Sequence, residues 1–205
     1  MSDPSPAYEF VSRAKLPTRF GEFTIHGFVE TATQQEHVAL SYGTWKTNAV
    51  VPIRIHSECL TGDALFSTRC DCGFQLEKAL QNIVEYGHGV ILYLRQEGRG
   101  IGLLNKIKAY SLQDTGMDTV EANEHLGFDA DLRDYSICKL MLDTLSIQNV
   151  ELMTNNPKKI NALKKMGINV VKRKPIDHGV TDDNKHYLMT KTAKLGHVFN
   201  PDKLK

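Results

Sequence analysis

The sequence predicts an α/β protein, with mixed sheets flanked by helices and at least one βαβ unit. Short apolar segments with the alternation of strands are interleaved with longer segments whose apolar residues recur at helical spacing. Residues 150–171 read as strand, helix and strand with short connections, which predicts a parallel pair with a right-handed crossover. The 205 residues are enough to bury a core without disulfides. We therefore expect one domain over residues 1–205, with the polar, proline-containing residues 1–8 unstructured.

The strands of the first half are expected at residues 21–28, 37–42, 50–56 and 89–94. In the third of these, Arg54 and His56 share one face, with isoleucines on the other, so this strand carries polar groups to the loop that follows. The fourth, Gly-Val-Ile-Leu-Tyr-Leu, is apolar enough to be buried on both faces.

Helical spacing predicts helices from Cys72 to Gly87 and over residues 103–114, 135–145, 157–166 and 184–195. The fourth has clear end signals, because Asn156 suits its N-cap, Pro157 its first position and Gly167 its end. Strands at 150–153 and 168–171 flank this helix. The polar stretch 118–133 is not assigned to an element.

Charge and composition disfavour several classes of protein. With 25 basic and 24 acidic residues the formal net charge is +1, and no basic block suggests nucleic acid as a partner. No apolar run is long enough to span a membrane, and the N-terminus lacks a signal-peptide pattern. A cytoplasmic location is expected, where cysteines serve metal binding or reactivity more often than disulfides.

Three cysteines form the most informative pattern in the chain. Cys59, Cys70 and Cys72 are spaced C-x10-C-x-C, and three thiolates in one loop suit a zinc ion. Three protein ligands rather than four would leave a position for water, as in catalytic zinc sites. The alternative is three buried thiols without metal, which fits poorly with the polar neighbours of Cys70 and Cys72. Cys138 lies on a predicted helix among apolar residues and is expected to be a core thiol.

Two strand–turn–helix connections could bind an anion. The glycines of residues 98–102 precede a helix, where backbone amides and the Arg99 guanidinium could hold phosphate oxygens. The alternative is a tight connection without a ligand. Residues 154–159 again follow a strand and open a helix, but Lys158 and Lys159 oppose the helix dipole unless an anion lies between them. The alternative there is a solvated, capped helix start.

Four segments together resemble GTP cyclohydrolase II. They are His56-Ser-Glu-Cys-Leu-Thr-Gly-Asp, Arg69-Cys-Asp-Cys-Gly-Phe-Gln-Leu, Gln96-Glu-Gly-Arg-Gly-Ile-Gly-Leu and Thr154-Asn-Asn-Pro-Lys-Lys. The resemblance runs from about Ala14 to His197. It implies hydrolysis of GTP to formate, pyrophosphate and 2,5-diamino-6-(5-phospho-ribosylamino)pyrimidin-4(3H)-one, the first step of riboflavin biosynthesis. It also implies a homodimer. Some relatives carry a butanone-phosphate synthase domain ahead of this one; only a short leader precedes it here, so that activity is expected to be absent.

The resemblance also implies roles for individual residues. One zinc ion per subunit would be held by Cys59, Cys70 and Cys72. Asp131 would be a proton acceptor, Arg133 a nucleophile and Tyr110 a residue that acts near the ring. The implied GTP contacts are Arg54, Ile55, His56, Ser57, Glu58, Gln75, Glu97, Gly98, Arg99, Thr119, Thr154 and Lys159. Magnesium is implied with the triphosphate, by the family rather than by any visible set of ligands.

Physical chemistry supports some of these roles better than others. Zinc would supply water of lowered pKa to open the guanine ring at C8. Arg99 and Lys159 suit charge neutralisation at the phosphates. A guanidinium, with a pKa above about 12, is a poor nucleophile. We therefore expect Arg133 to stabilise phosphate charge and Asp131 to orient Arg133 or a water molecule. The side chains of Asp131 and Arg133 would share a side if the backbone there is extended. A surface ion pair is the alternative.

Two other classes compete with this interpretation. One is a structural zinc module that binds a nucleotide without catalysis, in which Cys138 or His56 would complete a closed four-ligand site. The other is a zinc nucleobase deaminase, which combines an H-x-E segment with P-C-x-x-C, a combination not found here. The residue that reads guanine is not identified from the sequence.

Overall fold

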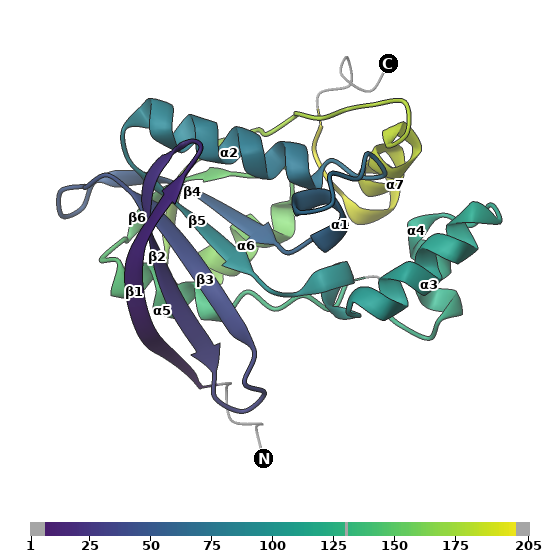
Figure 1. The fold of residues 1–205 in the computed structure, drawn as a ribbon, viewed down its shortest axis with the longest axis horizontal. Coiled ribbons are helices and arrows are strands. Elements are labelled where there is room, and N and C mark those ends of the chain that lie inside the picture. Colours follow the sequence, from purple (N-terminus) through teal and green to yellow (C-terminus); the bar gives the residue numbers. More distant parts are fainter. Residues whose placement is uncertain (1–6, 130, 200–205) are drawn as a thin grey trace.

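The computed structural model describes residues 7–129 and 131–199. A seven-stranded sheet has the order β1-β2-β3-β5-β4-β6-β7 (Figure 1). The strands are β1 (Tyr8–Thr18), β2 (Gly21–Glu30), β3 (Glu36–Tyr42), β4 (Val50–Ser57), β5 (Gly89–Leu94), β6 (Asn149–Met153) and β7 (Asn169–Lys174). The helices are α1 (Leu60–Asp63), α2 (Cys72–Tyr86), the 3-10 helix η1 (Glu97–Gly100), α3 (Leu103–Asp114), α4 (Thr119–His125), α5 (Ile137–Thr144), α6 (Pro157–Lys165) and α7 (Lys185–Leu195).

The sheet is mixed, as predicted. β1, β2, β3 and β5 pair in antiparallel fashion, whereas β4 pairs in parallel with both β5 and β6, and β6 with β7. The predicted βαβ unit is confirmed as β6–α6–β7. Its helix begins as expected, because the Asn156 side chain accepts a hydrogen bond from the Lys158 amide at 2.9 Å and Pro157 follows the cap.

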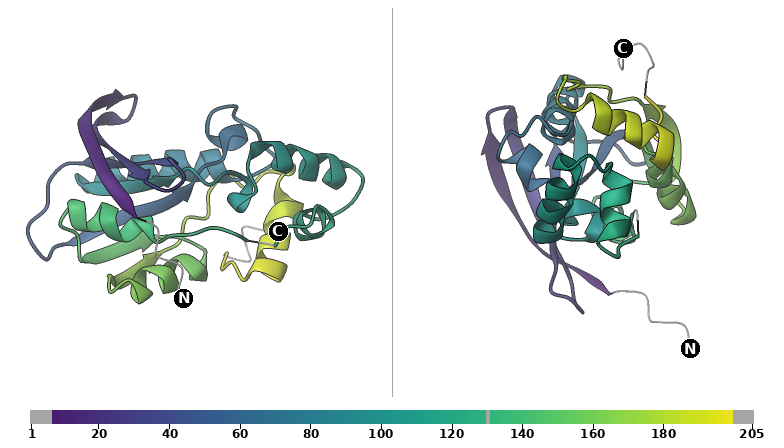
Figure 2. Two further views of the ribbon diagram at one scale, coloured as in Figure 1. Left: turned by 90° about the horizontal axis from the view of Figure 1, so that it is seen from below. Right: turned by 90° about the vertical axis from the view of Figure 1, so that its right-hand side faces the viewer.

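Helices cover both faces of the parallel half of the sheet. α2 lies on one face, and α5 and α6 lie on the other (Figures 1 and 2). Each face has its own core, and the central strand β5 contributes to both: Leu92 packs in the core beneath α5 and α6, and Ile91 in the core beneath α2. The prediction that this strand is buried on both faces is confirmed. In β4, Ile53 and Ile55 point into the larger core, so Arg54 is directed to the α2 side.

The first strand was not predicted from the sequence. β1 is an edge strand whose side chains are mostly exposed, so charged residues such as Arg13 and Lys15 hide the alternation expected of a half-buried strand. The prediction that residues 1–8 are unstructured is wrong at Tyr8, which begins β1. The Tyr8 hydroxyl lies 2.7 Å from that of Ser136. Residues 1–6 lie outside the described part of the chain.

Three short elements were also missed. α1 and η1 each span four residues, too few for a periodic pattern. α4 lies in the stretch left unassigned, although it has a readable start: Asp118 and Glu121 form a capping box. Among the described residues, no helix is long and apolar enough to cross a membrane.

The carboxyl ends of β4 and β5 define one end of the molecule. α3, α4 and α7 gather beyond this end (Figures 1 and 2). α4 and α7 contact one another although about 60 residues separate them in the chain. In sheets with parallel strands, this is the edge where ligands bind.

Candidate metal centre and substrate cavity

The three cysteines of the predicted metal site meet in space. Cys59 follows β4 and precedes α1, Cys70 lies in the loop after α1, and Cys72 is the first residue of α2. Their Sγ atoms all lie within 4.8 Å of one another, and those of Cys59 and Cys70 are 3.6 Å apart. The cysteine loop, residues 59–72, therefore brings three soft ligands to one point.

This cluster fits a zinc ion. Zn–S bonds of about 2.3 Å in a tetrahedron place sulfurs about 3.8 Å apart, close to the observed Cys59–Cys70 separation. Hydrogen bonds from Cys70 and Cys72, with the Lys106 ammonium, hold the pKa of Cys59 far below its ordinary value. The same crowding raises the pKa of Cys70 to about 11 and that of Cys72 well above its usual value. Without a cation, then, one thiolate leaves the other two protonated, and a divalent ion would allow all three to ionise.

Lys106 and Glu97 connect the cysteine loop to the glycine turn. The Lys106 ammonium lies 3.1 Å from Cys59 Sγ and 2.7 Å from Glu97 Oε1, and it is nearly buried. Glu97 also accepts hydrogen bonds from the amides of Leu60 and Gly98. Both carboxylate oxygens of Glu97 are thus engaged, and Glu97 fixes the two loops relative to each other.

Two glycines allow the cysteine loop to fold against α2. A Cβ on Gly73 would lie 2.1 Å from the carbonyl oxygen of Gly62, and a Cβ on Gly62 would lie 3.0 Å from Cys70 Sγ. The two backbones therefore touch directly beneath the thiol cluster, where no side chain fits.

Replacing Gly73 with Ala is expected to destabilise the protein by about 1–3 kcal/mol and to weaken zinc binding, because the backbones of the loop and α2 must separate. Urea unfolding and metal analysis of the purified variant measure both effects. Gly27→Ala is the matched control, since its Cβ would lie at an ordinary 3.8 Å from the Ser12 oxygen. A Gly73→Ala protein with unchanged stability and zinc content would contradict this account of the loop.

A cavity lies beside the thiol cluster at the carboxyl ends of β4 and β5. Most residues predicted for substrate, metal or catalysis line it: Arg54, His56, Ser57, Glu58, Cys59, Cys70, Cys72, Gln75, Glu97, Gly98, Arg99, Tyr110, Thr119, Arg133 and Lys159. Ile55, Thr154 and Asp131 are not among its lining residues. Ile55 is a core side chain whose carbonyl accepts a hydrogen bond from Lys159 at 2.8 Å. The Thr154 hydroxyl accepts one from the Asn156 amide, and Asp131 pairs with Arg133.

The cavity is strongly cationic. Arg54, Arg99, Arg133, Lys159 and Lys191 all line it. Burial, reinforced by Arg54 and Arg133, holds the pKa of Lys159 well below its usual value. Burial and the surrounding cations lower the pKa of His197 to about 2. Such mutual repulsion is expected where the counter-charge is a ligand rather than a side chain.

Arg99 is the clearest of these groups. Both terminal nitrogens of its guanidinium are buried and make no hydrogen bond within residues 7–129 and 131–199. Gly98 and Arg99 both have left-handed backbone angles, with φ of 62° and 63°, a strained conformation for arginine. The turn thus directs an unpaired cation into the cavity, which favours the predicted anion site over a simple tight connection.

Asp131 and Arg133 form a two-pronged ion pair in a stretch without regular structure. Arg133 Nε lies 2.7 Å from Asp131 Oδ1, and its Nη2 lies 2.9 Å from Oδ2. The side chain of Arg133 is 11% exposed and that of Asp131 is 6% exposed, so the surface ion pair considered from the sequence is wrong. Despite burial, hydrogen bonding to Asp131 raises the pKa of Arg133, and the pKa of Asp131 is correspondingly lowered by Arg133 and Lys158.

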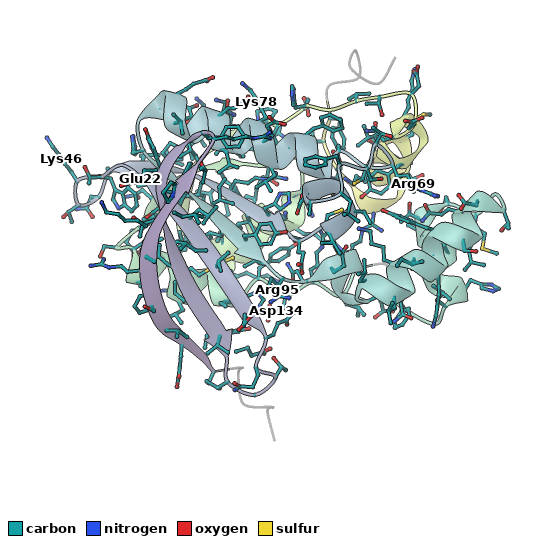
Figure 3. All side chains as sticks on the ribbon, in the orientation of Figure 1. Glu22, Lys46, Arg69, Lys78, Arg95 and Asp134 are labelled. Atoms are coloured by element: carbon teal, nitrogen blue, oxygen red, sulfur yellow. The ribbon has the colours of Figure 1, made fainter. Side chains whose placement is uncertain are left out.

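His56 and Tyr110 flank the thiol cluster. His56 Nε2 lies 3.0 Å from both oxygens of Asp63, and its Nδ1 is buried without a partner among the described residues. Burial lowers the pKa of His56, so the neutral ring donates to Asp63 from Nε2. The Tyr110 hydroxyl is 3.4 Å from that of Thr61. Arg69, labelled in Figure 3, belongs to the cysteine loop. Its guanidinium lies over the Tyr110 ring and pairs with Asp114 of α3. Burial raises the pKa of Tyr110, which keeps the phenol protonated.

Several lining residues were missed from the sequence: Arg69, Gln96, Ile101, Lys106, Ala109, Gln113, Asn123, Tyr187, Lys191 and His197. Gln113 comes from α3. Asn123 comes from α4, which lies in the stretch that was not assigned to an element from the sequence. Lys106 had a readable signal, since it lies one turn before Tyr110 on the same helix face. Tyr187 and Lys191 lie on α7, which was predicted as a helix but not connected to the site.

Cys138 and His56 do not complete a closed metal site. Cys138 is fully buried on α5 in the larger core and is not part of the thiol cluster, so its prediction as a core thiol is confirmed. His56 Nε2 is engaged by Asp63. The four-ligand arrangement expected of a structural zinc module is therefore not what the described residues form.

Comparison with known proteins identifies the family. Residues 9–175 match the model of the family described as GTP cyclohydrolase II. The GTP cyclohydrolase-2 of Azotobacter vinelandii is 64% identical over 189 residues, which cover 92% of this chain and 91% of that protein. The corresponding proteins of Hahella chejuensis and Pseudomonas syringae are 61% and 62% identical over 189 residues, covering 92% of this chain and 91% and 92% of theirs. The chain belongs to the GTP cyclohydrolase II family. The resemblance of its four segments and the prediction of a hydrolase are confirmed.

Proposed function

We propose that the chain hydrolyses GTP to formate, pyrophosphate and 2,5-diamino-6-(5-phospho-ribosylamino)pyrimidin-4(3H)-one, the opening step of riboflavin biosynthesis. The observation that carries this proposal is a three-thiol cluster that opens onto a cavity lined by buried cations, with the Arg99 guanidinium unpaired. A nucleoside triphosphate would supply the missing negative charge, with its purine ring beside the thiol cluster that lines the same cavity.

Cys59, Cys70 and Cys72 would hold one zinc ion in each chain. When bound, zinc would supply water with a pKa lowered to about 7, the reagent needed to open the ring and release C8 as formate. Lys106 stabilises the Cys59 thiolate through its contact of 3.1 Å. Tyr110, kept protonated by burial, would donate a proton or a hydrogen bond near the ring.

We assign the phosphates to the buried cations of the cavity. Arg99, Arg133 and Lys159 would bind their oxygens and stabilise the charge that develops as pyrophosphate leaves. Magnesium would accompany the triphosphate and complete the neutralisation. Asp131, held as a carboxylate by Arg133, orients that guanidinium toward the cavity.

The remaining contacts surround the nucleotide. Arg54, His56, Ser57, Glu58, Gln75, Glu97, Gly98 and Thr119 would contribute to binding from the cavity wall, and Ile55 and Thr154 would act through their backbone and packing. We further propose a single domain over residues 1–205 that forms a homodimer in the cytoplasm and does not bind nucleic acid.

The test is an assay of formate and pyrophosphate from GTP with magnesium, before and after removal of zinc. The expected result is stoichiometric formate and pyrophosphate from the zinc-loaded protein, loss of formate after chelation and recovery on adding zinc back. GTP binding without formate from fully loaded protein would instead favour the alternative, a structural zinc module that binds a nucleotide without catalysis.

A further inference from the structure

The C-terminal segment makes a wall of the cavity although it lies beyond the residues that match the family model. That match ends at residue 175, whereas Tyr187, Lys191 and His197 line the cavity. α7 and its neighbours are therefore part of the architecture of the site, and their contacts show how they are held there.

The segment is attached to the cysteine loop at several points. The Thr68 hydroxyl donates to Asp183 at 2.7 Å, and the Thr181 hydroxyl lies 3.5 Å from the Thr68 carbonyl. Gly179 packs so closely on Phe74, in the first turn of α2, that a Cβ would lie 2.2 Å from it. After α7 the chain returns to the β6–α6 connection, where the Val198 amide donates to the Asn155 carbonyl at 2.9 Å.

Lys191 makes the central contact of α7. Its ammonium lies 2.7 Å from Asp71 Oδ1, and the two residues are 8% and 1% exposed. Asp71 stands between the cysteines at 70 and 72 and directly precedes α2. Lys191 neutralises a buried carboxylate that would otherwise lie beside the thiolates of the metal site.

Asp71 is connected through Gln75 to Arg54, a residue that lines the cavity. The Gln75 amide donates to Asp71 Oδ2, and its oxygen accepts a hydrogen bond from Arg54 at 2.6 Å. A continuous buried chain therefore runs from Lys191 through Asp71 and Gln75 to Arg54. If Lys191 were absent, the unpaired Asp71 carboxylate would attract the Arg54 guanidinium, and Arg54 would change its position in the cavity.

Tyr187 connects α7 to the glycine turn. Its ring lies 4.3 Å from Lys191 Nζ and 6.0 Å from the Arg99 guanidinium. α7 thus touches the network on one side and the unpaired arginine on the other.

We propose that α7 is a substrate-binding element of this enzyme and that Lys191 is a positioning residue, which through Asp71 and Gln75 holds Arg54 in place for the nucleotide. The inference rests on the proposed function for the identity of that nucleotide. The family resemblance of the sequence assigns no role to Asp71 or to Lys191.

Lys191→Met tests the positioning role of Lys191, because methionine keeps the approximate length of the side chain and removes its charge. We expect the KM for GTP to rise about tenfold or more, kcat to change by less than about threefold, and zinc content to stay at the wild-type level. Lys191→Arg, which keeps the cation, should recover most of the affinity. Lys164→Met, an exposed lysine on α6, is the matched control and should behave as wild type.

A double-mutant cycle separates positioning from general damage. In Lys191→Met combined with Asp71→Asn, the rise in KM should be smaller than the product of the two single effects, because both changes act on the same contact. A wild-type KM in Lys191→Met, independent single effects, or zinc loss with an unchanged KM for the loaded fraction would each overturn the proposal. Binding of a non-hydrolysable GTP analogue compares the variants without turnover. Failure of the wild type to release formate would defeat the proposed function, and the binding comparison would still decide the role of Lys191.

Discussion

Replacing any one of Cys59, Cys70 and Cys72 with Ser is expected to remove zinc and to reduce formate release by about a thousandfold or more. Two sulfurs cannot hold the ion as three do, and the loss of activated water removes several kcal/mol of barrier lowering. The change is measured as zinc per chain by elemental analysis and as formate by a single-turnover assay. The fold should persist, since neither core includes a residue of the cysteine loop.

Cys138→Ala provides the control for this experiment. It removes the one other cysteine of the chain, which is fully buried on α5 and outside the thiol cluster. We expect a stability cost of about 1 kcal/mol from the small cavity, with zinc content and kcat unchanged. Zinc loss from Cys138→Ala, or full activity in any of the three serine variants, would contradict the assignment of ligands.

Arg133→Lys is expected to lower kcat/KM by about a hundredfold while leaving measurable product formation, and Asp131→Asn should lower it by a similar factor. A lysine keeps the positive charge for the phosphates but loses the two-pronged pair with Asp131. A guanidinium whose pKa is raised by its partner stays charged, so we expect Arg133 to act as an electrostatic stabiliser. Steady-state kinetics give the rates, and mass spectrometry of quenched reactions searches for an adduct. A covalent guanylyl group trapped on Arg133 would refute this role.

The same ion pair has a consequence for stability. Because Arg133 and Lys158 lower the pKa of Asp131, the pair stabilises the folded protein fully above the pKa of an unfolded aspartate, about 3.9. That contribution is lost as the pH falls below this value. Asp131→Asn should therefore unfold at lower urea concentration than the wild type at pH 7, and the difference should narrow toward pH 3. A difference that does not depend on pH would show that the pair contributes through packing instead.

The sequence was sufficient where local patterns and tertiary demands agree. The strand bearing Arg54 and His56 on one face, the helix capped by Asn156 and Pro157, and the parallel pair around it were all predicted, because burial imposes the same periodicity that the sequence carries. The spacing of three cysteines predicted a cluster that depends on a single loop. Each of these features is local in the chain.

Features that depend on distant contacts could not be predicted in this way. β1 is mostly exposed and is defined by its pairing with β2, not by its own pattern. The engagement of both Glu97 oxygens by Leu60, Gly98 and Lys106 requires the cysteine loop to meet the glycine turn. The contact between Lys191 and Asp71 joins positions 120 residues apart, and nothing near Lys191 in the sequence announces it.

X-ray absorption at the zinc edge of the resting protein measures whether the metal keeps one coordination position for solvent. We predict three sulfur neighbours at about 2.3 Å and one oxygen neighbour at about 2.0–2.2 Å that is exchangeable with added ligands. A spectrum with a fourth sulfur, or with a histidine nitrogen in every molecule, would mean that the site is closed and that hydrolysis does not occur there.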